Sequence, residues 1–224
     1  MVEIDIWTEG IADQKFIADI LKSWFNMEIN ESRTSSRSVV FECKNERNII
    51  SVRSAGSVSY FIAENGWKNI EKDFSDNRDL GRINLVIIDA DDNFIQQRNS
   101  VLTTSSGLVN EECLFLWPDN QAHPEKSDLE RLLAQIVVDS TTFFNCWNTY
   151  EICLNQQQNF FDPNGIFHVP DRKAMLYSYV AAYTGQPSEA NEGKRNYTNG
   201  LWVLDGDSAA LQPLKLFLET HINV

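Results

Sequence analysis

Residues 83–89, INLVIID, form the most hydrophobic run of the chain and decide its fold class. The run is too apolar to alternate between a buried and an exposed face, which predicts a strand buried on both faces of a parallel sheet. Parallel strands need crossover connections, and residues 93–105 have the pattern of a crossover helix. The run at 112–118, ECLFLWP, predicts another strand after that helix.

The N-terminal residues predict a strand followed by a helix. Residues 2–8, VEIDIWT, alternate between polar and apolar side chains and lead into a turn at Glu9-Gly10. Residues 11–25 place bulky apolar side chains on one helical face. The next segments are two β-branched runs, of which either or both are expected to be strands, and then a helical pattern: 38–42, 48–53 and much of 58–74.

Beyond residue 127 the pattern becomes mostly helical, and no strongly apolar strand follows. We expect helices over 127–138, 141–154, 171–183 and about 207–220, the last starting near Asp207 or Ser208, with a linker over 155–169 and a mobile segment over 186–200. Strands that alternate with helices indicate an α/β fold, with a Rossmann-like, mostly parallel central sheet flanked by helices. The predicted organisation is an α/β domain over 1–140 and a mainly helical C-terminal extension over 141–224, packed on the same domain.

Composition limits the classes of function. The 224 residues are 42% hydrophobic, which is enough for a packed core. The net charge of -13 argues against tight, nonspecific binding of nucleic acid by charge alone. The acidic N-terminus lacks the pattern of a secretory leader, no apolar run reaches transmembrane length, and the four cysteines form no C-x-x-C pair. We therefore expect a cytoplasmic protein without membrane contact.

Carboxylates follow two of the predicted strands. Glu9 comes after the first strand, and Asp89, Asp91 and Asp92 come at the end of the most buried one. Neighbouring parallel strands would bring these side chains to one edge of the sheet, where like charges repel unless protons or cations offset them. Hard divalent ions such as Mg²⁺ take oxygen ligands of this kind. The alternative is that acidic residues simply suit the polar rim of a sheet and the N-termini of the following helices.

These residues carry a resemblance to a known family. The segments EGIADQKF (9–16) and LVIIDADDN (85–93) resemble the toprim domain. The second half of the chain is similar to small bacterial toprim-like proteins related to overcoming-lysogenization-defect nucleases. The segments concerned are LFLWPDN (114–120), SDLERLLAQI (127–136), AMLYSYVAAY (174–183) and LWVLDGDSAALQPLKLFLE (201–219).

The resemblance implies a toprim-like fold for residues 1–140 and a metal site. Glu9 matches the toprim glutamate, which the family uses as a metal ligand or as general base and acid. Asp89 and Asp91 match the Asp-x-Asp metal ligands. The nuclease branch completes a second metal position with two more acidic residues, and Asp13 and Glu130 stand at the matching places.

Both of these last residues also have structural interpretations. Asp13 suits the first turn of a helix, where the helix dipole favours a negative charge. Ser127 and Glu130 fit a capping box, in which Ser127 caps a helix and the Glu130 side chain reaches back to the backbone N–H of Ser127. The sequence leaves these alternatives open.

The function that we expect is a Mg²⁺- or Mn²⁺-dependent enzyme that acts on phosphodiesters, a nuclease, with Glu9, Asp89 and Asp91 as core ligands. Two-metal phosphoryl transfer generally uses a cation beside the ions. The basic residues that flank the motif segments are Lys15, Lys126, Arg131, Arg172 and Lys173, of which we expect Lys15 and Lys126 to bind phosphate. DNA or RNA would be bound through the bridging metal. The alternative is a non-catalytic toprim-like module that binds a nucleic acid, a nucleotide or a protein partner.

Overall fold

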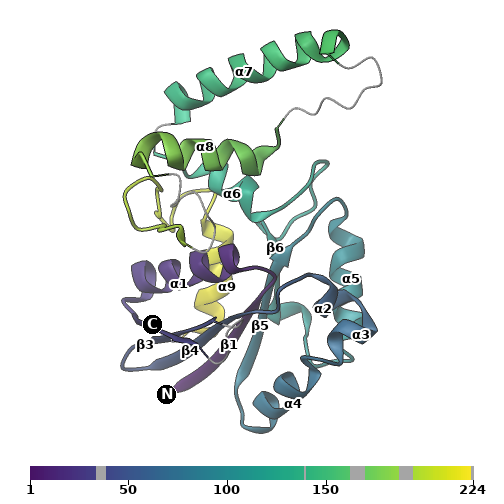
Figure 1. Ribbon diagram of the computed structural model, residues 1–224. Coiled ribbons are helices and arrows are strands. Elements are labelled where there is room, and N and C mark those ends of the chain that lie inside the picture. Colours follow the sequence, from purple (N-terminus) through teal and green to yellow (C-terminus); the bar gives the residue numbers. More distant parts are fainter. Residues whose placement is uncertain (34–38, 139, 162–169, 187–193, 223–224) are drawn as a thin grey trace.

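The computed structural model describes residues 1–33, 39–138, 140–161, 170–186 and 194–222. Within these residues six strands form one mixed sheet, in the order β2-β3-β4-β1-β5-β6 (Figure 1). The strands are β1 (Val2–Thr8), β2 (Glu28–Arg33), β3 (Val39–Lys44), β4 (Asn48–Ser54), β5 (Ile83–Asp89) and β6 (Leu114–Trp117). Strands β4, β1, β5 and β6 run parallel, and β3 is antiparallel to both its neighbours. The predicted α/β, Rossmann-like fold is confirmed.

Strand β5 lies between β1 and β6, as its apolar sequence predicts. Leu85 and Ile87 belong to the hydrophobic cluster on one face of the sheet, and Val86 and Ile88 belong to the cluster on the other. All four side chains are completely buried. Its last residue, Asp89, lies at the carboxyl end of the strand, between the parallel strands β1 and β6.

Helices cover both faces of the sheet. Figure 1 shows α1 (Ile11–Phe25) and α9 (Gln212–His221) on one side and the group α2 to α5 on the other. The first cluster also includes residues of α6 (Leu129–Gln135) and α8 (Arg172–Thr184), so both halves of the chain share one core. Helix α5 (Phe94–Thr104) confirms the predicted crossover between β5 and β6.

The segment expected as one helix over 58–74 is instead three short helices. These are α2 (Ser59–Ile62), α3 (Glu64–Trp67) and α4 (Glu71–Asp79). Helix α2 ends because Ala63 takes an extended conformation, with φ −115° and ψ 132°. Phe61, Trp67 and Phe74, one from each of these helices, pack into the same hydrophobic cluster on one face of the sheet.

Three other boundaries differ from the sequence prediction. Strand β2 was not predicted, because its sequence EINESR has little apolar character and it forms an edge of the sheet. Helix α7 (Ser140–Phe161) continues through most of the first half of the expected linker 155–169, and residues 162–169 lie outside the described part. Helix α9 starts at Gln212 rather than near Asp207 or Ser208, with a proline in its first turn.

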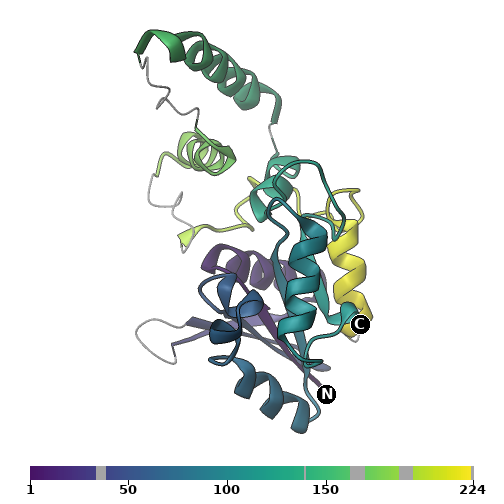
Figure 2. The same cartoon turned by 90° about the vertical axis from the view of Figure 1, so that its right-hand side faces the viewer.

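Helix α7 lies beyond α8, farther from the sheet, in both views (Figures 1 and 2). The rings of Phe143 in α7 and Tyr179 in α8 are in edge contact, with centroids 5.4 Å apart. Residues 187–193 of the expected mobile segment lie outside the described part. In the rest of that segment, Arg195 and Tyr197 are buried, and Tyr197 belongs to the hydrophobic core.

Candidate functional site

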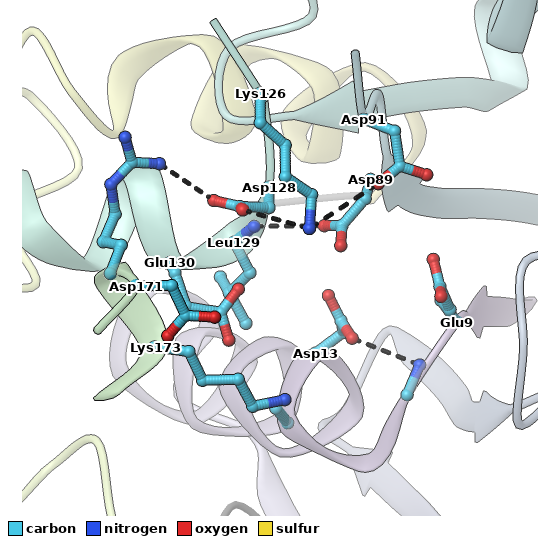
Figure 3. A pocket seen from close by; sticks show the side chains of 13 residues that line it. Glu9, Asp13, Asp89, Asp91, Lys126, Asp128, Leu129, Glu130, Asp171 and Lys173 are labelled. Carbon is cyan, nitrogen blue, oxygen red and sulfur yellow. Dashed lines mark hydrogen bonds and ion pairs between the residues drawn. The ribbon is translucent and has the colours of Figure 1, made fainter. Parts of the chain in front are cut away.

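A pocket of about 450 Å³ opens at the carboxyl ends of β1 and β5 (Figure 3). The two strands pair directly, with Thr8 beside Ile87, so the residues that follow them emerge together. The acidic residues that line the pocket are Glu9, Asp13, Asp89, Asp91, Asp128, Glu130 and Asp171. The structure therefore brings the five residues of the implied metal site to one pocket, together with two that were not predicted. Asp92, which was also expected at this edge of the sheet, does not line the pocket.

Glu9 is held in place through its backbone. Its carbonyl oxygen accepts hydrogen bonds from Ser54 Oγ at 3.0 Å and from the backbone N–H of Gly56 at 2.9 Å. Its side-chain Oε2 is buried and accepts no hydrogen bond from the described residues. Burial and the nearby charge of Asp91 raise the pKa of Glu9. One oxygen of Glu9, Oε2, is thus desolvated and lacks a hydrogen-bond donor, which suits it to bind a cation.

Asp89 and Asp91 are fixed by the loop that leads into α6. Asp89 Oδ1 accepts a hydrogen bond from the backbone N–H of Leu129 at 3.0 Å. Asp91 has a left-handed backbone, with φ 51°, and exchanges two backbone hydrogen bonds of 2.9 Å with Ser127. These bonds join the end of β5 to the start of α6 and make both segments walls of one pocket.

Asp13 is buried in the first turn of α1 and both of its oxygens are bound. Oδ1 accepts a hydrogen bond from the indole Nε1 of Trp117 at 2.8 Å, and Oδ2 accepts one from the backbone N–H of Gly10 at 3.1 Å. The second bond fits the helix-start role that the sequence suggested. The first bond comes from the end of β6 and fixes the direction of the carboxylate, which the helix start alone does not require.

The start of α6 corrects the predicted capping box. Asp128, not Ser127, is the N-cap, and its Oδ1 accepts from the backbone N–H of Arg131 at 2.9 Å. Ser127 Oγ instead donates to the carbonyl of Glu125 at 3.2 Å. Because the helix starts one residue later than expected, Glu130 is not the capping-box residue, and it lines the pocket. Sequence reasoning missed Asp128, although Asp and Ser are equally good N-caps and the sequence offered both.

Of the two lysines predicted to bind phosphate, only Lys126 lines the pocket. Lys126 Nζ is 3.8 Å from Asp91 Oδ1 and 3.7 Å from Asp128 Oδ2 (Figure 3). Burial opposes its charge, but these two carboxylates outweigh that effect and raise the pKa of Lys126. Lys15, the other predicted phosphate ligand, is not part of the pocket lining, and its ammonium lies 5.7 Å from the ring centroid of Phe41.

The carboxylates of the pocket strongly perturb one another. Burial and the charges of Asp13 and Glu9 raise the pKa of Asp89 to about 9. Burial and the charges of Glu130 and Glu9 raise the pKa of Asp13 to about 7. The pocket therefore holds more negative charge than it can keep ionised without a counter-charge, and it must take up protons or cations.

A divalent ion suits the donor chemistry of this pocket but not the present spacing of its side chains. The donors are all carboxylate oxygens, which hard ions prefer, and Glu9 Oε2 lacks a partner. Within the described ranges, however, no three His, Cys, Asp or Glu side chains converge closely enough to hold a metal ion as they stand. Binding would require the side chains to rotate inward.

Comparisons with known proteins bear on the fold alone. A scan of protein-family models found no match, and neither did a search of curated proteins. Among the solved structures, a hypothetical protein from Pyrococcus horikoshii OT3 matches with a TM-score of 0.52 and 15% sequence identity, over 99% of this chain and 95% of that one. Across the described residues, no helix is long and apolar enough to cross a membrane. The chain is thus similar in fold to an archaeal protein over nearly its whole length.

Proposed function

We propose that this chain is a Mg²⁺- or Mn²⁺-dependent phosphodiester-acting enzyme, a nuclease of the toprim type. The observation that carries the proposal is the position of Glu9, Asp89 and Asp91 at the ends of two paired strands, around one pocket. A glutamate after the first strand and an Asp-x-Asp after the buried one are the features of the toprim resemblance. The pocket also lies where α/β sheets place their functional sites, at the carboxyl ends of the strands.

The residues fit a divalent ion by their chemistry. Glu9, Asp89 and Asp91 would hold it, and Asp13 and Glu130 would extend the site to a second ion. A bound ion of this kind supplies activation of water and neutralises the charge of the phosphoryl group. Glu9 Oε2 has no hydrogen-bond donor in the described part of the chain, so a cation would satisfy an oxygen that is otherwise unpaired.

The remaining roles fall to residues of the pocket wall. Glu9, whose pKa is raised, is suited to accept a proton from the attacking water. Lys126 is suited to bind a non-bridging oxygen of the phosphodiester, since its ammonium is only loosely paired with Asp91 and Asp128. The substrate under this proposal is DNA or RNA.

A second candidate is a non-catalytic toprim-like module that binds a nucleic acid, a nucleotide or a protein. The specific observation in its favour is Lys126, whose ammonium already lies between two carboxylates of the site. An internal cation in that place neutralises part of the pocket without metal. The net charge of -13 also favours a partner other than a bare polyanion.

Cleavage assays separate the two candidates. Labelled single-stranded, duplex and structured DNA and RNA are incubated with the purified protein in EDTA, Mg²⁺ or Mn²⁺. We expect cleavage only with the metals and its loss in Glu9→Gln, while the exposed Glu46→Gln control remains active. Metal-dependent binding without cleavage would support the module, and cleavage that survives Glu9→Gln would place the chemistry elsewhere.

A further inference from the structure

Two arginines lie beside the carboxylate pocket and share one exposed glutamate. Arg131 comes from α6 and Arg172 from the first position of α8. Glu125, in the loop before α6, has its Oε2 at 3.7 Å from Arg131 Nη1 and 3.9 Å from Arg172 Nη2. Two segments far apart in the sequence, residues 125–131 and the start of α8, thus bring three basic side chains together at a site that we call the arginine bay: Arg131, Arg172 and the adjoining Lys126.

Glu125 interacts only weakly with the two arginines of this bay. Its side chain is 70% exposed, and both distances exceed hydrogen-bonding range. Exposed ion pairs of this kind contribute only about 0–1 kcal/mol. A competing anion therefore displaces Glu125 at little cost.

Arg131 provides a buried hydrogen-bond donor that has no acceptor in the described part of the chain. Its Nη1 is buried and donates no hydrogen bond to any described residue. Buried donors in folded proteins are nearly always satisfied, and a guanidinium nitrogen is costly to leave bare. His123 Nδ1 lies 3.4 Å from the other terminal nitrogen, Nη2, and this contact helps to fix the guanidinium group. Nη1 is left to donate to a bound acceptor.

Arg172 connects the bay to the pocket. It lines the carboxylate pocket, and its Nη1 lies 3.2 Å from Asp128 Oδ1, while Nη2 points toward Glu125. A cation at the N-terminus of a helix is disfavoured by the helix dipole, so its placement there needs anionic neighbours. The 13-residue helix α8 directs its positive end to the same place.

We propose that the arginine bay binds a backbone phosphate of a nucleic-acid strand, adjacent to the phosphate in the carboxylate pocket. The oxygens of this phosphate replace Glu125 and accept from Arg131 Nη1 and Arg172 Nη2, a geometry for which guanidinium groups are well suited. The bay itself is independent of metal, whereas its role in placing the strand for cleavage rests on the proposed function. Although the protein has a net charge of -13, the arginine bay gives it a local site that can bind a polyanion.

Binding of inorganic pyrophosphate in EDTA tests the bay without any metal. Its affinity is obtained from the rise in melting temperature with pyrophosphate concentration. We expect Arg131→Gln and Arg172→Gln each to weaken binding by about tenfold, as for a lost hydrogen bond to a charged group. Glu125→Gln should strengthen binding, by about threefold or more, because the competing anion is removed.

The chain offers a matched control pair. Arg98 and Glu111 form an ion pair of 3.4 Å, with side-chain exposures of 20% and 72% that resemble the 21% and 70% of Arg131 and Glu125. Arg98→Gln and Glu111→Gln should leave the affinity within about twofold of the parent, since a distant surface charge is screened. Tighter binding by Glu125→Gln cannot come from misfolding, so it keeps the test valid if Arg172→Gln is unstable.

A second arm identifies the source of the phosphate. Fluorescence anisotropy with a labelled single-stranded oligonucleotide, at low salt in EDTA and again in Ca²⁺, should rank the five variants in the same order. Pyrophosphate binding without this ranking for the oligonucleotide would overturn the assignment to a nucleic-acid strand. Parent-like affinities of Arg131→Gln and Arg172→Gln, or equal effects of Glu125→Gln and Glu111→Gln, would overturn the bay. Because both arms include EDTA, absence of metal-dependent cleavage would contradict the proposed function alone.

Discussion

At the residue scale, Asp89 shows how the fold places ionisable groups close together in this pocket. Its carboxylate is partly buried beside Asp13, Glu9 and Glu130, and its pKa is raised to about 9. One of its oxygens accepts from the backbone of Leu129, and that bond needs an oxygen but not a charge. The fold therefore needs an oxygen at this position but not an ionisable carboxyl group.

Replacing Asp89 with asparagine tests this separation. Asparagine keeps an oxygen for the Leu129 N–H and removes the repulsion, so Asp89→Asn should be more stable than the parent in EDTA. We expect a gain of about 1–2 kcal/mol, or about 3–6 °C in melting temperature for a chain of this size. The variant should also lose the stabilisation by millimolar Mn²⁺ that the parent shows. A parent that melts at one temperature with and without Mn²⁺ would argue against a metal at Asp89.

Trp117 is the residue that orients Asp13. Trp117→Phe keeps most of the ring packing but leaves Asp13 Oδ1 without its buried donor, so we expect a loss of stability of about 1–3 kcal/mol. We also expect weaker Mn²⁺ binding in calorimetry, because the carboxylate is no longer held toward the pocket. Trp202→Phe is the matched control, since Trp202 is also buried and its Nε1 donates no hydrogen bond within the described part. Equal Mn²⁺ affinities of the two variants would show that Trp117 only fills space.

At the element scale, the three short helices between β4 and β5 depend on a close approach at one glycine. A Cβ atom at Gly66 would lie 2.2 Å from the carbonyl oxygen of Ser59. Helix α3 therefore folds back against α2 at a distance that only glycine allows. This contact turns the chain so that Trp67 reaches the core.

Gly66→Ala should consequently destabilise the protein, although alanine is the better helix former. The clash is with backbone, which cannot move aside like a flexible side chain, and we expect a loss of about 2 kcal/mol or more. The exposed neighbour Asn65→Ala should change stability by less than about 0.5 kcal/mol. Urea denaturation compares the two variants, and a Gly66→Ala protein as stable as the parent would refute the close packing of α2 and α3.

The arrangement of strands and helices explains which residues of the site the sequence could predict. The positions of Glu9 and Asp89 followed from two apolar strands, because side chains after neighbouring parallel strands must meet at one edge. Lys15, expected as a phosphate ligand, does not line the pocket: it lies two residues after Asp13 in α1, and such residues point about 200° apart around a helix. Asp128 was missed because its neighbour Ser127 is an equally good cap, and only tertiary contacts decided between the two.

At the scale of the whole molecule, the pocket links stability to pH. Asp89 and Asp13 have raised pKa values in the folded state, so the folded chain binds more protons than the unfolded chain between about pH 4 and 9. Their contribution to stability is therefore lost progressively as the pH rises through that window. A divalent ion competes with these protons and should replace them at the upper end.

Denaturant midpoints of the parent and Asp89→Asn in EDTA, measured from pH 5 to 9, should show this coupling. We expect the parent to lose stability relative to the variant as the pH rises, because unfolding of the parent, but not of the variant, releases a proton from residue 89. The stabilisation of the parent by Mn²⁺ should be larger at pH 8.5 than at pH 5.5. A constant difference between the two proteins over this range would mean that Asp89 titrates as it does in the unfolded chain.

The central claim is that the pocket of Glu9, Asp89 and Asp91 is a divalent metal site, and a crystal structure with Mn²⁺, read from its anomalous scattering, tests it most directly. We predict a strong anomalous peak within about 2.0–2.6 Å of oxygens from these three residues, with Lys126 moved away from Asp91. A second peak between Asp13 and Glu130 would complete a two-ion site. A structure at saturating Mn²⁺ with no anomalous peak in the pocket, and with Lys126 still between Asp91 and Asp128, would contradict the account.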